Sequence, residues 1–186
     1  NDTKVSPPTT TLSALGDAAI FSCWLRGGSA PGWDNWVFDI GDAPGPYVSA
    51  LVPDSSGNVV WNAAGDTLTW EDSTPTDWRD CWVHYAFVKD ARTGRMAIYC
   101  NSEKVAERTG AYTSLAAVRN TGFDIGARRG HYSDYVGCID DFRVYNTALA
   151  DPGPDPDELL LWYKFDESQG STVADSSGQS MDATVD

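Results

Sequence analysis

The chain has 186 residues, of which 41% are hydrophobic and 22% are charged, a composition typical of one folded globular domain. Its formal net charge of −14 argues against nucleic acid and anionic membranes as partners. No stretch approaches the roughly 18 consecutive apolar residues of a membrane-spanning helix, so we predict no membrane insertion.

Short runs of β-branched and aromatic residues alternate with Gly, Pro and Asp along the chain, and helix patterns are nearly absent. The clearest hairpin pattern joins residues 82–88 to residues 96–100, and a second surrounds residues 64–66. Further strands are predicted, in chain order, at residues 19–25, 36–40, 47–52, 59–61, 67–70, 123–126 and 138–145. Many short strands with this punctuation indicate an all-β fold, an antiparallel β-sandwich without long helices.

The last part of the chain has a pattern of its own. Residues 150–158 contain alternating prolines, which are stiff and extended and therefore predict a spacer. An apolar strand follows at residues 159–167, with apolar residues on both faces, and leaving it free would expose an aggregation-prone segment. We therefore divide the chain into a core at residues 1–149, the spacer at 150–158 and a closing segment at 159–186.

Three segments, in the right order, resemble one family. The early strand resembles that of laminin G-like jelly-roll domains of the concanavalin A-like type, in the residues GDAAIFSCW at positions 16–24. The hairpin at 82–101 resembles the central hairpin of this family, and residues 123–126 with 137–149 resemble its closing segment. The resemblance implies a jelly-roll β-sandwich that binds carbohydrate or acts in adhesion outside the cell.

The family usually opens with a strand like residues 160–166 and a loop like TVADSSG at 172–178, which here follow the closing segment. Three arrangements are therefore open. The chain is a circular permutant that completes its own sheet, a piece of a tandem array, or a subunit that donates Leu159 to Val185 to a neighbouring copy. The last two predict an extracellular filament or array built from copies of the chain.

The four cysteines, Cys23, Cys81, Cys100 and Cys138, show no C-x-x-C spacing, which argues against a zinc site. In an extracellular chain they predict two disulfides, or one disulfide and two buried thiols. A bridge from Cys23 to Cys138 would close a long loop and stabilise the fold by about 4–5 kcal/mol.

Acidic residues gather near the end of the chain, with eleven acidic and two basic residues from Ile139 to Asp186. The loop from Asp175 to Asp182 carries carboxylates at both ends around a Gly turn, an arrangement that suits Ca²⁺, and the family resemblance also implies calcium there. The predicted ligands are Asp175, Ser177 and Asp182, with Asp140 from a strand. The alternative is an Asx-type turn that holds no ion.

Eight Trp and eight Tyr are more than a core of this size needs. Trp24 and Trp82 lie within strand patterns and are predicted to pack in the core. Aromatic rings in or beside loops are predicted to stack on sugars, with neighbouring polar groups bonding the hydroxyls. The predicted ligand-binding residues are Trp33, Asp34, Trp36, Trp61, Trp70 and Tyr132. The alternative is that these rings seal the ends of the sandwich or a subunit interface.

Catalytic patterns are weak. The E-x-D-x-E run of jelly-roll glucanases is missing, and the adjacent carboxylates of Asp140 and Asp141 would point to opposite faces of a strand. His84 is predicted to be structural, and His131 has no evident Ser or Cys partner. We therefore predict a non-catalytic extracellular recognition module that binds a glycan or matrix polymer with the help of calcium. A filament subunit is the first alternative and a glycan-active enzyme is the second.

Overall fold

The computed structural model describes residues 4–28, 34–41, 45–71, 81–118, 122–129, 135–148 and 156–186. Within these residues two antiparallel sheets of eight and six strands form a sandwich, which confirms the predicted fold class. The eight-stranded sheet has, in spatial order, β13 (Thr172–Val173), β14 (Ala183–Val185), β1 (Val5–Ser6), β10 (Phe123–Ile125), β3 (Trp36–Ile40), β4 (Val48–Leu51), β5 (Val59–Ala63) and β6 (Asp66–Trp70). The six-stranded sheet has β12 (Leu159–Tyr163), β11 (Gly137–Tyr145), β2 (Ala18–Gly27), β7 (Val83–Asp90), β8 (Arg95–Cys100) and β9 (Glu103–Arg108).

The two predicted hairpins are both present, and glycine shapes their turns. The turn between β5 and β6 places Ala64 and Gly65 at φ angles of 55° and 96°, the left-handed region that hairpin turns of this type require. In the turn between β7 and β8, Gly94 has a φ of 69°, and a Cβ there would lie 2.5 Å from the ring of Tyr112. Only three 3₁₀ helices accompany the strands in the described residues, namely η1 (Thr9–Ala14), η2 (Leu115–Ala117) and η3 (Pro156–Glu158).

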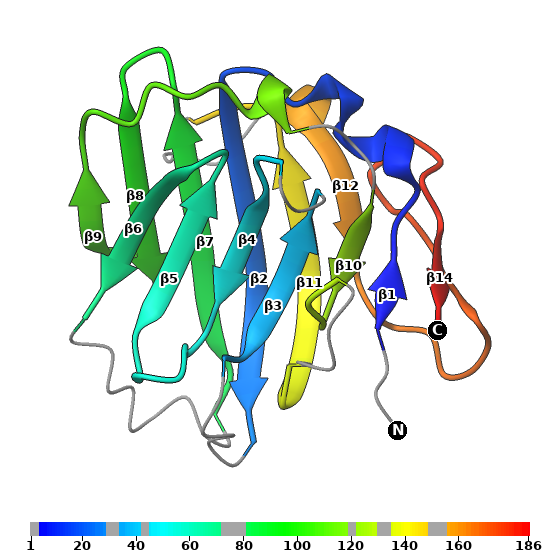
Figure 1. Cartoon of the computed structure of the whole chain (residues 1–186). Helices are drawn as coiled ribbons and strands as arrows, with labels where there is room; N and C mark the ends of the chain where they lie inside the picture. The colour runs from blue at the N-terminus through cyan, green and yellow to red at the C-terminus, as the bar shows by residue number, and fades with distance from the viewer. Residues whose placement is uncertain are drawn as a thin grey trace.

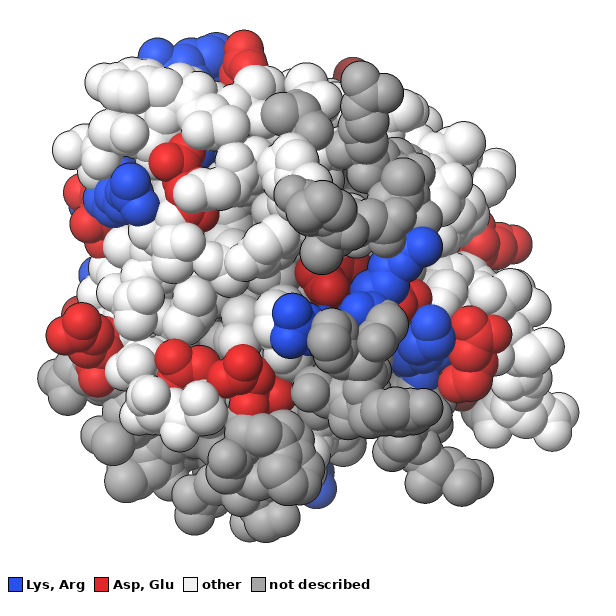
Figure 2. Space-filling model, viewed as in Figure 1, with Lys and Arg blue, Asp and Glu red and all other residues white. Residues whose placement is uncertain are grey.

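The outer face of the eight-stranded sheet, which is nearer the viewer in Figure 1, carries one row of polar side chains in register across all its strands. The row runs through Thr172, Thr184, Ser6, Asp124, Asp39, Ser49, Asn62 and Thr67. Acidic and basic groups meet near the middle of this face in Figure 2. The central members Asp124, Asp39 and Ser49 are buried, whereas the members at both ends are exposed. We call this set the polar row.

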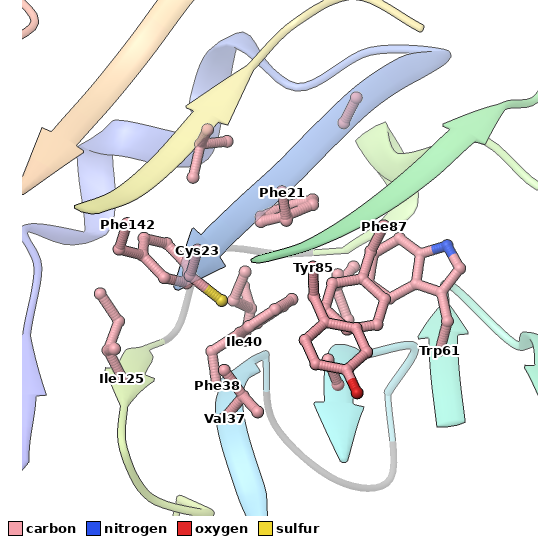
Figure 3. Close-up of a cluster of buried hydrophobic side chains, with 14 of the residues drawn as sticks. Phe21, Cys23, Val37, Phe38, Ile40, Trp61, Tyr85, Phe87, Ile125 and Phe142 are labelled. Atoms are coloured by element: carbon pink, nitrogen blue, oxygen red, sulfur yellow. The ribbon is translucent and has the colours of Figure 1, made fainter. Parts of the chain in front are cut away.

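The core lies between the sheets and is rich in aromatic rings. Phe21 of β2 stacks on Phe38 of β3 with ring centroids 5.0 Å apart, and Trp61 of β5 packs 5.6 Å from both Phe21 and Phe87 (Figure 3). Trp61 is fully buried, and its indole N–H donates to the Val88 carbonyl at 3.2 Å. Because each such ring removes a large apolar area from water, these contacts join the two sheets into one body.

The C-terminal segment completes both sheets of its own chain. Strand β12 pairs with β11, so that Tyr163 lies opposite Phe142 and Leu161 opposite Val144. Strand β14 pairs with β1, with Val185 opposite Val5. In this chain the segment therefore returns to its own sandwich, as the permutant arrangement predicts, and its donation to a second copy stays a prediction.

The predicted disulfides are wrong in this structure, where all four cysteines are free. Cys23 is 1% exposed and faces the core from β2, whereas Cys138 lies opposite Arg26 and is exposed on the other side of the sheet. Of the other two free cysteines, Cys81 is exposed before β7 and Cys100 packs partly against the core. No described helix has the length and apolar character needed to cross a membrane.

Candidate functional site

The aromatic residues predicted to bind sugar are mostly buried. Trp61 belongs to the core, and this part of the prediction is wrong because a ring with 0% exposure offers no face to a ligand. Trp70, on the edge strand β6, is half-buried against the core. Asp34 accepts a hydrogen bond from the Ser55 backbone N–H at 3.0 Å, which ties it to a loop. Trp33, Tyr132 and also His131 lie outside the described residues.

Trp36 takes part in the outer face of the eight-stranded sheet, although it is only 6% exposed. A register shift after Trp36 places it opposite Leu51, whereas the next paired residues, Phe38 and Ala50, belong to the core. The guanidinium of Arg128 covers its ring at 4.7 Å. A ring covered in this way has no free face for a sugar.

The two tryptophans predicted to pack in the core are instead exposed. Trp24 is 38% exposed and Trp82 is 42% exposed, so this prediction is wrong. Alternation along β2 explains the error, because Cys23 and Leu25 face the core and Trp24 between them must face outwards. Trp82 lies two residues before His84, which also faces outwards from β7.

An exposed aromatic site therefore lies on the outer face of the six-stranded sheet. Strand pairing puts Trp24 between His84 of β7 and Asp140 of β11. The rings of Trp24 and His84 are 5.3 Å apart and tilted by 59°. Arg26, two residues further along β2, is exposed on the same face. We call Trp24, Arg26, Trp82, His84 and Asp140 the Trp24 face.

A charged cluster beside the Trp24 face fixes the neighbouring strands. The pairing of β11 with β2 shifts between Asp140 and Arg143, and at this bulge Asp141 takes a φ of 51°. Its carboxylate accepts hydrogen bonds from the Arg143 guanidinium at 3.0 Å and from the indole N–H of Trp162. Arg143 and Lys164 lie 4.5 and 4.4 Å from the Trp162 ring centroid. Trp162 is thus held by cations, whereas Trp24 and Trp82 are the rings on this face that stay open to a ligand.

The chemistry of the Trp24 face suits hydroxyl groups. Burial lowers the pKa of His84, and Arg143 lowers it further, while the Asp141 carboxylate raises it less than burial lowers it. His84 is therefore neutral at pH 7, and a neutral imidazole can both donate and accept a hydrogen bond. Arg26 donates and Asp140 accepts, so a sugar stacked on Trp24 would meet both kinds of partner.

The predicted calcium loop is a hydrogen-bonded turn. One carboxylate oxygen of Asp175 accepts the backbone N–H groups of Trp162 and Ser177, at 3.0 and 2.9 Å. The other accepts the Ser177 hydroxyl at 2.7 Å and the Met181 N–H at 3.1 Å. These four donors occupy the lone pairs that a cation would need, so the residues present do not fit Ca²⁺.

The other predicted calcium ligands do not complete a metal site either. Asp182 accepts the backbone N–H of Asp175 at 2.9 Å, and Asp140 accepts that of Asp141 at 2.7 Å. In the described part of the chain, no three His, Cys, Asp or Glu side chains are grouped as a metal would require. The geometry therefore favours the ion-free Asx turn that the sequence left open.

One carboxylate pair does meet, in the polar row. Asp39 and Asp124 lie directly opposite each other on β3 and β10, at 8% and 5% exposure. Asp124 binds the Lys4 ammonium at 3.2 Å and the Ser6 hydroxyl at 2.9 Å, and Asp39 accepts the Arg129 backbone N–H at 3.2 Å. Burial raises the pKa of Asp39 to about 6, although Arg129 and Arg128 oppose the rise. Because both groups are buried and already bonded, they lack the access to substrate that a glycosidase pair needs.

Comparison with known families agrees with this fold. A family model described as the concanavalin A-like lectin/glucanases superfamily matches residues 1–152. The chain belongs to that superfamily. None of the curated proteins matches it in sequence. Membership confirms the resemblance found in the sequence, and the superfamily contains both lectins and glucanases by its own description.

Several solved structures of this superfamily member's fold come from carbohydrate-related proteins. A putative carbohydrate binding protein from Bacteroides ovatus is 20% identical with a TM-score of 0.77, and the match covers the whole chain but 56% of that protein. The CBM40 of a Ruminococcus gnavus sialidase, bound to α2,3-sialyllactose, is 16% identical with a TM-score of 0.61 over 81% of this chain and 84% of that one. Domain 4 of an extracellular arabinanase from Geobacillus stearothermophilus, with arabinotriose, is 19% identical with a TM-score of 0.55 over 72% and 63%. At these identities the likeness establishes the fold.

Proposed function

We propose that the chain is a non-catalytic, extracellular carbohydrate-binding module that holds a glycan on the Trp24 face. The exposed Trp24 ring, on a rigid strand between His84 and Asp140, carries this proposal. Because the sheet already holds the Trp24 ring in position, no loop has to become ordered when a sugar binds. A stacked sugar would therefore retain most of the contact energy. The glycan-bound neighbours support the class of ligand, and the buried Asp39–Asp124 pair speaks against catalysis.

Titration of the chain against a panel of neutral and acidic oligosaccharides tests the proposal. For the glycan that binds, we expect the Trp24→Ala variant to lose about 2 kcal/mol, or about thirtyfold in affinity, as a central aromatic contact does. The matched control is Tyr47→Ala, because Tyr47 is equally exposed at 41% but lies beside β4 in the other sheet. A panel without any binder, or equal affinities of the parent and the Trp24→Ala variant, would sink the proposal.

Assembly by strand exchange is a second candidate function, favoured by the way the C-terminal segment docks. Leu161 and Tyr163 of β12 are fully buried in the core, and β14 is held through β1. A segment that supplies one strand to each sheet could do so for a second copy with the same contacts. Size-exclusion chromatography with light scattering over a range of concentrations tests it, because exchange predicts dimers or longer chains, whereas a monomer throughout would rule it out.

A further inference from the structure

Arg26, on the Trp24 face, is a cation without a partner among the residues that the structure describes. Most of the described lysines and arginines form ion pairs with carboxylates. Arg128 and Lys164 instead lie over tryptophan rings. Arg26 is exposed near the end of β2, and within the described part of the chain it forms neither an ion pair nor a ring contact. The N–H donors of its guanidinium are therefore available to a ligand.

The two lateral neighbours of Arg26 bring no carboxylate to it. Cys138 of β11 lies directly opposite Arg26 on one side and is exposed. On the other side Leu25 pairs with Val83, so the residue before Val83, Trp82, comes next to Arg26. Trp82 is 42% exposed. The guanidinium thus lies between a thiol and an open aromatic ring.

The carboxylate of the Trp24 face is turned to another partner. Asp140 lies two residues beyond Cys138 on β11, opposite Trp24, and one of its oxygens accepts the Asp141 backbone N–H at 2.7 Å. Asp141 itself binds the Arg143 guanidinium at 2.9 Å. The face therefore has two unlike halves, with an accepting carboxylate beside Trp24 and an unpaired cation beside Trp82.

We propose that the glycan bound on the Trp24 face is acidic, with a carboxylate or sulfate group that binds Arg26. The proposal rests on the function proposed above and specifies the class of its ligand. A sugar stacked on Trp24 directs its hydroxyls to His84 and Asp140. Arg26 lies two residues along the same strand, about 7 Å away, so the acidic group belongs to the next sugar of the chain. The planar fork of an arginine matches two oxygens of a carboxylate or sulfate and so fixes the orientation of the glycan.

The net charge of −14 is compatible with an acidic ligand at this place. At physiological ionic strength, charges on the surface are screened over about 8 Å, so the groups next to the bound anion decide its affinity. On the Trp82 side of Arg26 the nearest charge is the guanidinium itself, and Asp140 lies towards Trp24. The remote carboxylates lower the affinity without selecting another site.

Isothermal titration with matched acidic and neutral forms of one oligosaccharide tests the proposal. Trigalacturonic acid and its methyl ester form the carboxylate pair, and a sulfated galactan tetrasaccharide and its desulfated form make the sulfate pair. We expect the acidic form of one pair to bind about tenfold more tightly than its neutral form, the value of one charged hydrogen bond. High NaCl should remove most of this preference. The pair that shows the preference identifies which acidic group is recognised.

Three variants separate the charge from the ring. Arg26→Gln keeps a polar side chain without the charge and should bind both forms of the pair equally, with no dependence on salt. Trp24→Ala should weaken both forms. Arg92→Gln is the matched control, because Arg92 is 62% exposed on the turn after β7, and it should keep the full preference. Circular dichroism verifies that each variant is folded.

The refuting results distinguish this proposal from the glycan-binding function. If the glycans that bind are neutral, or if the acidic and neutral forms bind equally, the proposal is overturned while the glycan-binding function stands. A preference for the acidic form that survives in Arg26→Gln would also overturn it, because another group would then hold the acid. If no glycan binds at all, both proposals are overturned.

Discussion

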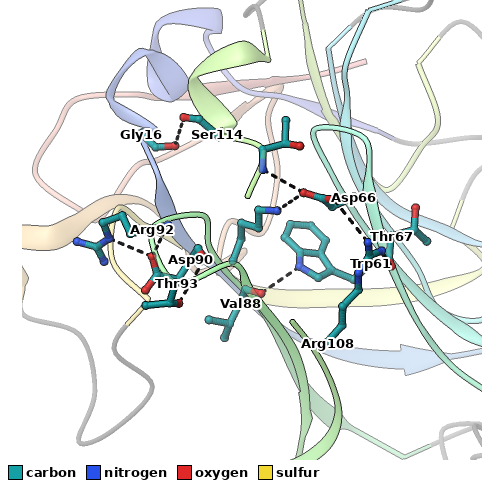
Figure 4. Close-up of polar contacts among 12 residues, drawn as sticks. Gly16, Trp61, Asp66, Thr67, Val88, Asp90, Arg92, Thr93, Arg108 and Ser114 are labelled. Carbon is teal, nitrogen blue, oxygen red and sulfur yellow. Dashed lines mark hydrogen bonds and ion pairs between the residues drawn. The ribbon is translucent and has the colours of Figure 1, made fainter. Parts of the chain in front are cut away.

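The ion pair between Lys89 and Asp66 allows a sharp test of the energetics of this fold. Lys89, on β7, is fully buried, and its ammonium lies 2.6 Å from a carboxylate oxygen of Asp66 at the start of β6. Asp66 has a side chain that is 13% exposed, and it also accepts the Thr113 N–H at 3.2 Å and lies 3.7 Å from Arg108 (Figure 4). The two partners are therefore unequal, because the lysine depends on the aspartate more than the reverse.

The Asp66→Ala variant should lose about 3–5 kcal/mol of unfolding free energy, because it leaves a buried ammonium without a counter-charge. The Lys89→Met variant keeps the apolar stem and removes the charge, and Asp66 retains its other partners. Its loss should be about 1 kcal/mol or less, since replacing a buried ion by a hydrophobic residue is often neutral. Urea unfolding followed by tryptophan fluorescence measures both. Equal losses, or a larger loss for Lys89→Met, would refute this reasoning.

The same pair gives an expected pH dependence. Burial raises the pKa of Asp66, but the hydrogen bond and charge of Lys89 and the bonds to Thr113 outweigh it, so the pKa lies below its usual value. A lowered carboxyl pKa contributes stability that is present above the unfolded value, about 3.9, and is lost as the pH falls through the folded value. This acid-induced loss should be smaller in Lys89→Met than in the parent.

Three further predictions concern Asp39, Asp175 and the effect of calcium on the C-terminal loop. The raised pKa of Asp39, about 6, means that the protonated form favours folding, so this contribution falls between pH 4 and pH 6. Asp39→Asn should therefore gain stability relative to the parent as the pH rises over that interval, and a difference that is independent of pH would contradict the shift. In the C-terminal loop, Asp175→Asn should cost about 2 kcal/mol, because an amide N–H₂ would face donors. Millimolar calcium should leave the Tm of the parent unchanged, and a clear rise in Tm would show that the loop binds the ion after all.

The strand pattern was sufficient to predict the sandwich and its two hairpins, because turns with Gly and runs of β-branched residues are local signals. The face of the sheet to which each side chain points was harder to predict from the sequence. Along β2 both parities contain apolar residues, so Trp24 could not be distinguished from its buried neighbour Cys23 by alternation alone. Only the pairing with β7 and β11 determines which parity faces the core.

The calcium and disulfide predictions depended on which side chains lie close together in the folded chain. The composition of the sequence does not show this. Asp175 and Asp182 do lie close together, but their oxygens accept backbone N–H groups. A matching Asp-Ser-Ser-Gly segment at residues 54–57 forms the same kind of turn, with the Asp54 carboxylate accepting the Ser56 N–H at 2.9 Å. The repeat of the tetrapeptide thus indicated a turn, and a comparison of the two segments could have favoured that interpretation over a metal site.

The pairing of β1 with β14 determines where any segment attached to this sandwich would begin. Lys4 and Asp186 exchange backbone hydrogen bonds of 3.4 and 3.0 Å. The backbone at Lys4 and the backbone at Asp186 therefore lie one strand spacing apart. Anything attached at either end would start from the same corner of the eight-stranded sheet. Such attachments would lie on the eight-stranded sheet, so the Trp24 face on the outer side of the other sheet would point away from them and stay accessible to a ligand.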